Sequence, residues 1–296
     1  MRVGVTVPMS AGDGQGRMPT WPEILQFAVH AERLGFDSLW VCDHFTSDPG
    51  DRPAEGIHEA WTIVSALAAS TTSVELGQLV LCAAFRSPAL LAKMAATADW
   101  VSGGRLTIGL GVGSSVDELE SFGYRADHRV SRFEEAVTIV RGLLRDGTVK
   151  LDGRFHLVPD GELLPRPARP IPLLIAGNSR RVLGITARSA DAWNTAWFSR
   201  PDGRLDDRLR AMDAALHDVG RAPETLRRTI GIRVEDPASV SAENRDPDAF
   251  GGSVDELVEV LEAYARLGFD DVIVGLAPMS VGSLERLATA RRRSAT

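Results

Sequence analysis

The stretch that decides the fold is "AERLGFDSLWV" at residues 31–41, because it holds the end of a helix, a tight turn and a buried strand. A second stretch, "AYARLGFDDVIV" at residues 263–274, repeats it closely. In each copy Leu-Gly ends the helix and Phe-Asp forms the turn into an apolar run, as a glycine C-cap followed by a short αβ loop would. The recurrence predicts a repeated structural unit that leads into the second and the last strand.

The same alternation runs along the whole chain. Short apolar, β-branched runs predict strands at residues 3–7, 38–41, 74–81, 106–110, 171–176, 192–197, 228–234 and 271–276. Apolar residues at helical spacing predict helices at 21–34, 59–69, 88–101, 132–144, 180–189, 205–219, 254–267 and 283–292. Nearly continuous apolar strands between helices indicate a parallel sheet covered on both faces. Eight such units favour closure into a (β/α)8 TIM barrel, and we predict one α/β domain over residues 1–296.

One segment interrupts this rhythm. Residues 147–170 contain two short β-like pieces among several prolines, directly after the fourth long predicted helix. This composition predicts a short hairpin insertion rather than a second domain.

Composition limits the function classes. The formal charge of −7 argues against sequence-independent nucleic-acid binding, which depends on many Lys and Arg side chains that neutralise phosphates. No run approaches the ~18 apolar residues that a membrane span needs. Two cysteines are too few for a disulfide scaffold, and the first residues do not resemble a signal segment. We therefore expect a cytoplasmic protein that binds neither nucleic acid nor membrane.

Polar residues follow the second predicted strand at the place where barrel enzymes keep their active sites. Asp43 and His44 come directly after its apolar run, and active sites of TIM barrels lie at the C-terminal ends of the strands. The alternative is a simple turn with a hydrogen-bonded histidine. No His-x-His pair or bridging lysine accompanies these two residues, so no metal is predicted.

Two other strand ends favour a ligand. The fourth strand leads into "GLGVG", where Gly109, Gly111 and Gly113 alternate and let backbone approach a ligand or a neighbouring strand closely. The fifth strand ends in "AGNSRR", where residues 177–179 can present the next helix's first N–H groups to a phosphate, with Arg180 or Arg181 adding charge. An ordinary helix N-cap is the alternative for this second turn.

Side chains near the strand ends supply candidates for a substrate pocket. Aromatic side chains offer large apolar contact area, although each of them could equally belong to the core. Arg86 could pair with an anionic substrate or a cofactor tail, or it could cap a helix. The predicted pocket residues are Phe45, Trp61, Arg86, Trp193 and Asn194.

Several segments, taken in order, resemble one enzyme superfamily. They are "AERLGFDSLWVCDHF", "EAWTIVSALAASTTSVELGQLVLCAAFRSPALLAKMAATADWVSGGRLTIGLGVG", "RFEEAVTIVRGLL" and "IPLLIAGNSRRVLGITARSADAWN". The chain is similar over residues 3–194, and again at the last βα unit, to the bacterial luciferase-like superfamily. Within it, the chain most resembles the branch of coenzyme F420-dependent oxidoreductases.

The resemblance implies roles for particular residues. Asp43 and His44 would lie against the reactive face of the deazaflavin. A bulge with a non-prolyl cis peptide at Leu79-Val80, with Cys82 close behind, would back the ring, and a phosphate would bind at Gly177 and Asn178. The expected cofactor-binding set is Asp43, His44, Leu79, Val80, Cys82, Gly111, Gly113, Gly177, Asn178 and Ser179.

The resemblance also has a departure. Val116 stands where several members carry a glutamate that serves as proton donor or cofactor contact; Asp117 or Glu118 could substitute, although Glu118 more resembles a structural acid.

The function that follows is hydride transfer between F420 and a small organic molecule. His44 would be the general acid or base, because imidazole exchanges protons near neutral pH, and Asp43 would orient it. One alternative is an FMN-dependent monooxygenase that uses reduced flavin and oxygen. Another is a noncatalytic flavin-binding protein, which is suggested by the valine at position 116 in place of a glutamate. The expected partners are a small-molecule substrate, a second copy in a homodimer, and a flavin or F420 reductase that supplies the reduced cofactor.

Overall fold

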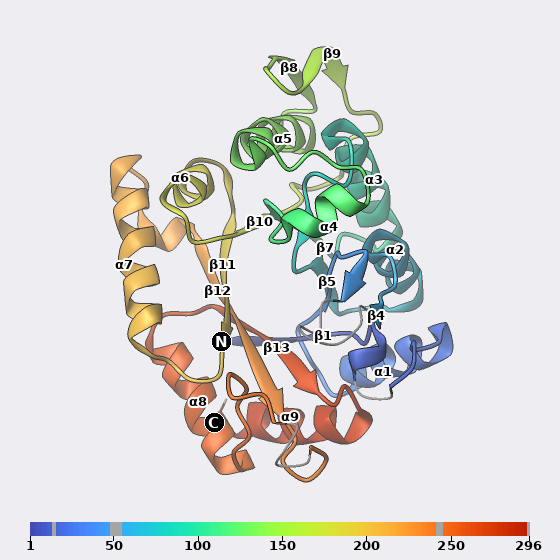
Figure 1. Ribbon diagram of the computed structural model, residues 1–296, viewed down its shortest axis with the longest axis vertical. Coiled ribbons are helices and arrows are strands. Elements are labelled where there is room, and N and C mark those ends of the chain that lie inside the picture. Colours follow the sequence, from blue (N-terminus) through green and yellow to red (C-terminus); the bar gives the residue numbers. More distant parts are fainter. Residues whose placement is uncertain (14–15, 48–54, 241–244, 295–296) are drawn as a thin grey trace.

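The computed structural model describes residues 1–13, 16–47, 55–240 and 245–294, and its centre is a closed parallel β-barrel. Its eight strands are β1 (Arg2–Thr6), β2 (Ser38–Val41), β5 (Glu75–Gln78), β7 (Leu106–Gly111), β10 (Leu173–Ala176), β11 (Ala192–Phe198), β12 (Arg227–Glu235) and β13 (Asp271–Ala277). Neighbours pair in parallel, and β10 pairs with both β11 and β7, which closes the ring (Figure 1). The predicted TIM barrel is confirmed.

Helices surround the barrel and alternate with its strands (Figure 1). They are α1 (Trp21–Arg33), α2 (Ala60–Ser70), α3 (Pro88–Val101), α4 (Val116–Ser121), α5 (Arg129–Arg145), α6 (Arg180–Ser189), α7 (Gly203–Asp218), α8 (Val254–Arg266) and α9 (Val281–Ser294). All eight helices predicted from the sequence are present, with ends that differ by a few residues. The short α4 was not predicted.

The repeated Leu-Gly-Phe-Asp motif has the same structural task in both copies. The glycine of each copy ends its helix with a positive φ, 84° after α1 and 82° after α8. The aspartate that follows accepts a backbone N–H from the start of the adjacent strand: Asp37 Oδ2 from Val3 at 2.8 Å, and Asp270 Oδ2 from Arg228 at 2.8 Å. The motif therefore stops a helix and joins two neighbouring strands at the bottom of the barrel.

A single tryptophan fills much of the barrel interior. The indole of Trp40 is 1% exposed and donates to the hydroxyl of Ser38 at 2.8 Å. A Cβ at Gly77 would lie 2.4 Å from this ring, and one at Gly4 would lie 2.8 Å from its Nε1. The glycines on the flanking strands thus make room for the ring. The interior cluster around it contains Leu174, Ala192 and Ile273, with Leu79 and Val80 packed against it.

The interruption at residues 147–170 is the predicted hairpin. Strands β8 (Thr148–Asp152) and β9 (Leu157–Glu162) pair antiparallel beyond the outer side of α5 (Figure 1). Glu135 on α5 holds the turn, because its carboxylate accepts the backbone N–H groups of Arg154, Phe155 and His156. The insertion is therefore anchored to the barrel and makes no separate core.

The third strand differs from the prediction of one run over residues 74–81. Strand β5 ends at Gln78, and after a break the chain resumes as β6 (Leu81–Cys82), which pairs with the end of β7. The break contains a non-prolyl cis peptide at Leu79-Val80, as the family resemblance implies. Two further short strands, β3 (Thr46–Ser47) and β4 (Glu55–Gly56), pair with each other after β2.

Candidate functional site

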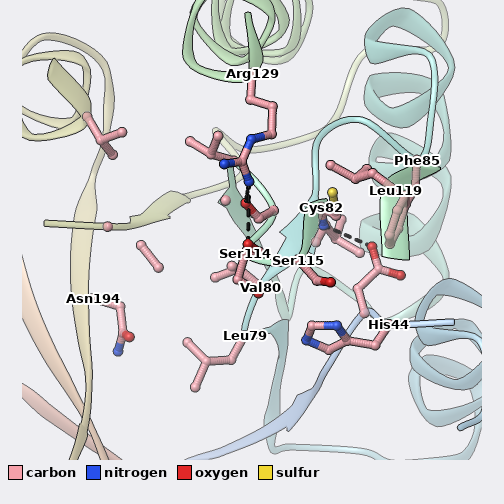
Figure 2. A pocket seen from close by; sticks show the side chains of 18 of the residues that line it. His44, Leu79, Val80, Cys82, Phe85, Ser114, Ser115, Leu119, Arg129 and Asn194 are labelled. Carbon is pink, nitrogen blue, oxygen red and sulfur yellow. Dashed lines mark hydrogen bonds between the residues drawn. The ribbon is translucent and has the colours of Figure 1, made fainter. Parts of the chain in front are cut away.

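A cavity of about 440 Å³ opens at the C-terminal ends of β2, β7, β10 and β11 (Figure 2). This is the end of a TIM barrel that carries active sites. All ten residues expected to bind the cofactor line it: Asp43, His44, Leu79, Val80, Cys82, Gly111, Gly113, Gly177, Asn178 and Ser179. Asn194, expected in the substrate pocket, lines it too. The strand ends that the sequence singled out separately therefore meet around one space.

The floor of this cavity is apolar and closely packed. Leu79 and Val80 form it and rest on the interior cluster around Trp40. A Cβ at Gly111 would lie 2.6 Å from Val80, and one at Gly113 would lie 2.7 Å from the sulfur of Cys82. The alternating glycines therefore let β7 approach the broken third strand, and Leu79 and Val80 present apolar side chains to the cavity.

His44 is held by a carboxylate that comes from the unpredicted helix α4. The imidazole Nδ1 lies 3.0 Å from Oε2 of Glu118, while the other carboxylate oxygen accepts the backbone N–H of Phe45 at 2.6 Å. An ionised carboxylate can only accept hydrogen bonds, so the Nδ1 of His44 carries a proton and Nε2 is left for a ligand. The His44 side chain is 43% exposed and that of Glu118 is 9% exposed, so the acid anchors a ring that remains accessible.

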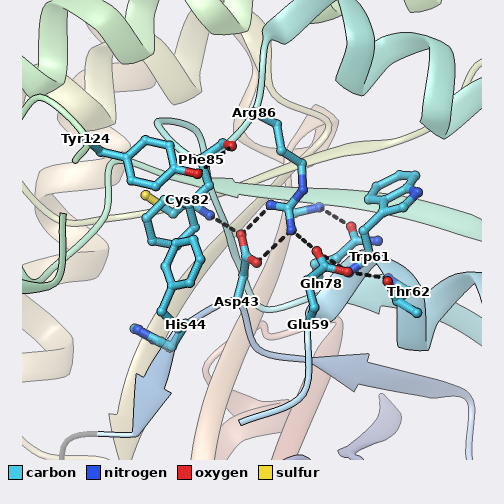
Figure 3. A network of polar contacts seen from close by, with 12 residues as sticks. Asp43, His44, Glu59, Trp61, Thr62, Gln78, Cys82, Phe85, Arg86 and Tyr124 are labelled. Atoms are coloured by element: carbon cyan, nitrogen blue, oxygen red, sulfur yellow. Dashed lines mark hydrogen bonds and ion pairs between the residues drawn. The ribbon is translucent and has the colours of Figure 1, made fainter. Parts of the chain in front are cut away.

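Asp43 does not orient His44, which corrects the expected role. Its carboxylate receives two hydrogen bonds from Arg86, at 2.7 and 2.9 Å, and a third from the backbone N–H of Cys82 at 2.9 Å. Figure 3 shows that the side chains of the adjacent residues Asp43 and His44 point in different directions. Side chains alternate in direction along extended backbone, so neighbouring residues face different partners. Asp43 instead fixes the chain just after the broken strand.

Arg86 is the partly buried counterion of Asp43 and does not line the main cavity. Its side chain is 13% exposed and also contacts Glu59, which caps α2 by accepting the N–H groups of Trp61 and Thr62 (Figure 3). Bidentate pairing of this kind is strong and directional. The guanidinium is thus paired with two carboxylates. This corrects the expectation that Arg86 contacts a substrate in the main cavity.

Three aromatic residues expected in the pocket also lie elsewhere. Trp193 is fully buried and donates to the carbonyl of Gly177, so it supports the turn from behind. Trp61 is on the outer side between α2 and α3. Phe45 stacks on Phe122 at 4.2 Å between ring centroids. Their apolar character reflects packing, which a sequence pattern cannot distinguish from ligand contact.

The opposite end of the cavity is suited to an anion. The turn at Gly177, Asn178 and Ser179 leads directly into α6, whose first-turn N–H groups are the positive end of the helix dipole. Gly177 has φ of 150°, and a Cβ there would lie 2.7 Å from Val182. The side-chain oxygen of Asn178 accepts from Thr195 at 3.0 Å, which leaves its amide N–H groups for a ligand.

The positive charge at this end comes from Arg129 rather than from Arg180 or Arg181. Arg129 begins α5 and lines the cavity, with its guanidinium donating to the carbonyl oxygens of Gly113 and Ser114 (Figure 2). Arg181 turns away and pairs with Glu134 on α5 at 2.7 Å. Sequence reasoning missed Arg129 and the hydrogen bond that His44 donates to the carboxylate of Glu118. The sequence signal that could have indicated α4 was Ser115, a favourable N-cap residue with Asp117 and Glu118 in the turn that follows.

The two cysteines should be chemically inert in the folded chain. Burial raises the pKa of the Cys82 thiol to about 11 and that of Cys42 to about 12. At pH 8 the reactive thiolate is therefore scarcer than on an unperturbed cysteine, by about two orders of magnitude for Cys82 and about three for Cys42. We expect iodoacetamide to label Cys82 about 100-fold, and Cys42 about 1000-fold, more slowly in the native protein than in urea, as measured by mass spectrometry. Rapid labelling of native Cys82 would show that the cavity floor is open.

The sequence matches the luciferase-like monooxygenase family over residues 1–235, which is more than half of the chain. The protein therefore belongs to this family, and the predicted superfamily is confirmed. Within the described ranges, no helix is long and apolar enough to cross a membrane.

Curated relatives carry the name of one activity. An F420-dependent glucose-6-phosphate dehydrogenase from Intrasporangium calvum is 28% identical over 295 residues, which cover 85% of this chain and 88% of that protein. One of the same name from Amycolatopsis mediterranei is 29% identical over 218 residues, covering 72% of this chain. The aligned part spans 64% of the Amycolatopsis enzyme. These names agree with the predicted F420 branch.

Solved structures share the fold along the whole chain. An F420-dependent secondary alcohol dehydrogenase in complex with an F420-acetone adduct superposes with a TM-score of 0.81 at 19% identity, covering 99% of both chains. A monooxygenase from Streptomyces bottropensis superposes with a TM-score of 0.79 at 21% identity, covering 99% of this chain and 98% of that one. At these identities the likeness establishes the architecture alone.

Proposed function

We propose that this protein is an F420-dependent oxidoreductase in which His44 exchanges the proton that accompanies hydride transfer. The observation that carries the proposal is the anchored imidazole beside an apolar floor: Glu118 holds Nδ1, and Nε2 is left for a ligand. The names of the curated relatives support F420 as the cofactor. The substrate is a small organic molecule that is reduced or oxidised by two electrons.

The cavity suits a deazaflavin with a phosphate. Its volume of about 440 Å³ lies within the usual range for cofactor and ligand sites. Leu79 and Val80 offer an apolar surface for a ring system, and Gly111 and Gly113 line the same cavity without side chains. The turn at Asn178 and the guanidinium of Arg129 provide donors for a phosphate at the far end. The cavity thus combines an apolar surface with donors for an anion, which supports the proposal.

The chain's own residues then have separate tasks. When bound, F420 supplies a carbon that gives or takes a hydride. His44 would give or take a proton at Nε2, and the carboxylate of Glu118 would stabilise the imidazolium during that step. The ion pair of Asp43 and Arg86 would keep the backbone at Cys82, and with it the floor, in place. No separate acid is needed at Val116 in this scheme, because the anchored histidine carries the proton.

The test is a titration of the purified protein with oxidised F420 and, separately, with FMN, followed by quenching of ligand fluorescence. We expect saturable, micromolar or tighter binding of F420 and much weaker binding of FMN. The comparison discriminates between the two functions because one ring position, a carbon in F420 and a nitrogen in FMN, determines whether the reduced cofactor reacts with oxygen. Tight FMN binding without F420 binding would contradict the proposal and favour the monooxygenase alternative.

The expected partners and location stay predictions. Helix α3 exposes Leu90, Trp100 and Val101, and this outer face is where we expect a second copy of the chain in a homodimer. A reductase that regenerates reduced cofactor is expected from the chemistry alone. The two cysteines are unpaired, as a cytoplasmic protein would keep them.

A further inference from the structure

A tryptophan near the end of β11 lies over two glycines of the next two strands. A Cβ at Gly231 on β12 would lie 3.0 Å from Cε3 of the Trp197 indole, and a Cβ at Gly275 on β13 would lie 3.7 Å from its Cζ3. The absence of a side chain at both positions leaves the space that the ring occupies. The indole of Trp197 therefore spans β12 and β13.

This indole lies inside the barrel, across its mouth from the cavity floor. On β12, Ile230 and Ile232 belong to the core between the barrel and its helices. Side chains alternate along a strand, so Gly231 between them faces the barrel interior. In the closed ring of eight strands, β12 is four strands away from β5 in either direction. Leu79 and Val80 directly follow β5, so they lie opposite the indole.

The ring is supported on one side only. Within the described ranges, Trp197 is not among the partly buried apolar side chains that pack against either hydrophobic cluster. Its side chain is half-buried, and the main cavity reaches Ala196, the residue directly before it. An indole that rests on backbone and stays partly open offers its other face to a ligand.

The cation beside this ring is already neutralised. The guanidinium of Arg233 lies 5.8 Å from the ring centroid, close to the ~6 Å limit of a cation–π contact. It donates to the carboxylate of Asp246 at 2.8 Å. Asp246 is held in turn, because Glu235 accepts its backbone N–H at 2.7 Å. A phosphate placed here would have to displace one carboxylate and lie near a second, so this side of the mouth is suited to an uncharged molecule.

We propose that Trp197 is the specificity-determining wall of the substrate pocket, and that it selects an uncharged ketone with a flat ring. The inference rests on the proposed function, since it takes hydride transfer beside Leu79 and Val80 as given. The ring of the ketone packs on the indole, while its carbonyl group faces His44. The carbonyl carbon accepts the hydride of reduced F420 and the oxygen accepts the proton of the His44 imidazolium. The products are a secondary alcohol, oxidised F420 and neutral histidine.

The experiment measures the binding of three probes to the full-length protein loaded with oxidised F420, by isothermal titration calorimetry. Acetophenone carries a ketone on a flat ring, acetone carries the ketone without a ring, and glucose-6-phosphate carries a dianion. Oxidised F420 has no hydride to give, so the ketones bind without turnover.

The variants are Trp197→Ala and Trp197→Phe, and the second keeps an aromatic ring if loss of the indole perturbs the fold. Leu157→Ala is the control, because Leu157 is an exposed apolar residue on the hairpin strand β9. Circular dichroism and the affinity for F420 check that each variant keeps its fold and its cofactor site.

We expect Trp197→Ala to bind acetophenone about 10-fold more weakly than the wild type and Trp197→Phe to bind it within about threefold, because an aromatic contact is lost only in the first. Affinities for acetone and F420 should stay within about twofold in all variants, since neither ligand packs on the indole. Glucose-6-phosphate should neither bind nor reduce F420, as followed by F420 absorbance.

Three results would overturn the inference: unchanged affinity of Trp197→Ala for acetophenone, absence of acetophenone binding to the wild type, or reduction of F420 by glucose-6-phosphate. A parallel loss of F420 affinity in Trp197→Ala would overturn it as well, by placing the indole at the cofactor. Failure of the wild type to bind F420 would instead defeat the proposed function.

Discussion

Replacement of His44 by Ala is expected to lower turnover with F420 by about 10²- to 10⁴-fold, the usual worth of a positioned proton-transfer group. The dissociation constant for F420 should change far less, because the apolar floor and the anion-binding end are untouched. Stopped-flow measurement of cofactor oxidation or reduction, with binding measured in parallel by fluorescence, separates the two effects. Loss of both in proportion would mean that the histidine binds the cofactor without proton chemistry.

Glu118→Gln is the matched control for this prediction. The amide oxygen can still accept a hydrogen bond from Nδ1, but the negative charge that stabilises the imidazolium is gone. We expect a smaller loss of turnover than for His44→Ala, together with a change in the pH profile of kcat, which a purely structural role would not produce. A variant with wild-type turnover and an unchanged profile would show that Glu118 only supports the backbone of Phe45.

Arg86→Met is expected to lower the free energy of unfolding by about 3–5 kcal/mol, because it leaves a buried carboxylate without its counterion. Asp43 is 5% exposed, and after the substitution it still accepts the backbone N–H of Cys82 but has lost the guanidinium. Urea unfolding followed by circular dichroism measures the loss. F420 affinity should fall as well, because the same carboxylate holds the chain behind the cavity floor.

A double-mutant cycle is the control for this second prediction. Asp43→Asn combined with Arg86→Met removes both charges, so the double variant should be more stable than the sum of the two single losses implies. An additive result would mean that Asp43 and Arg86 do not interact in the folded protein. A loss below about 1 kcal/mol for Arg86→Met would mean that water already solvates the carboxylate of Asp43, as at an exposed ion pair.

The sequence by itself determined the barrel and the location of its functional end. Strand and helix periods are local properties, since they follow from the spacing of apolar side chains along the chain. The Leu-Gly-Phe-Asp turns, the hairpin insertion and the glycines at residues 109–113 were readable for the same reason, and the structure confirms all three. The break after Gln78 was also predicted, because the family resemblance implies it and that resemblance rests on consecutive residues.

Only the tertiary structure decided how the polar side chains pair. Asp43 and His44 are adjacent in sequence, yet they contact Arg86 and Glu118, which are 43 and 74 residues away. Helix α4 has six residues, too few to show a clear helical period, so the sequence suggested Glu118 as a structural acid but did not show that it holds His44. The aromatic residues were misjudged and Arg129 was missed for the same reason: whether a side chain faces a cavity or the core depends on the packing of distant segments, which barrel closure brings together.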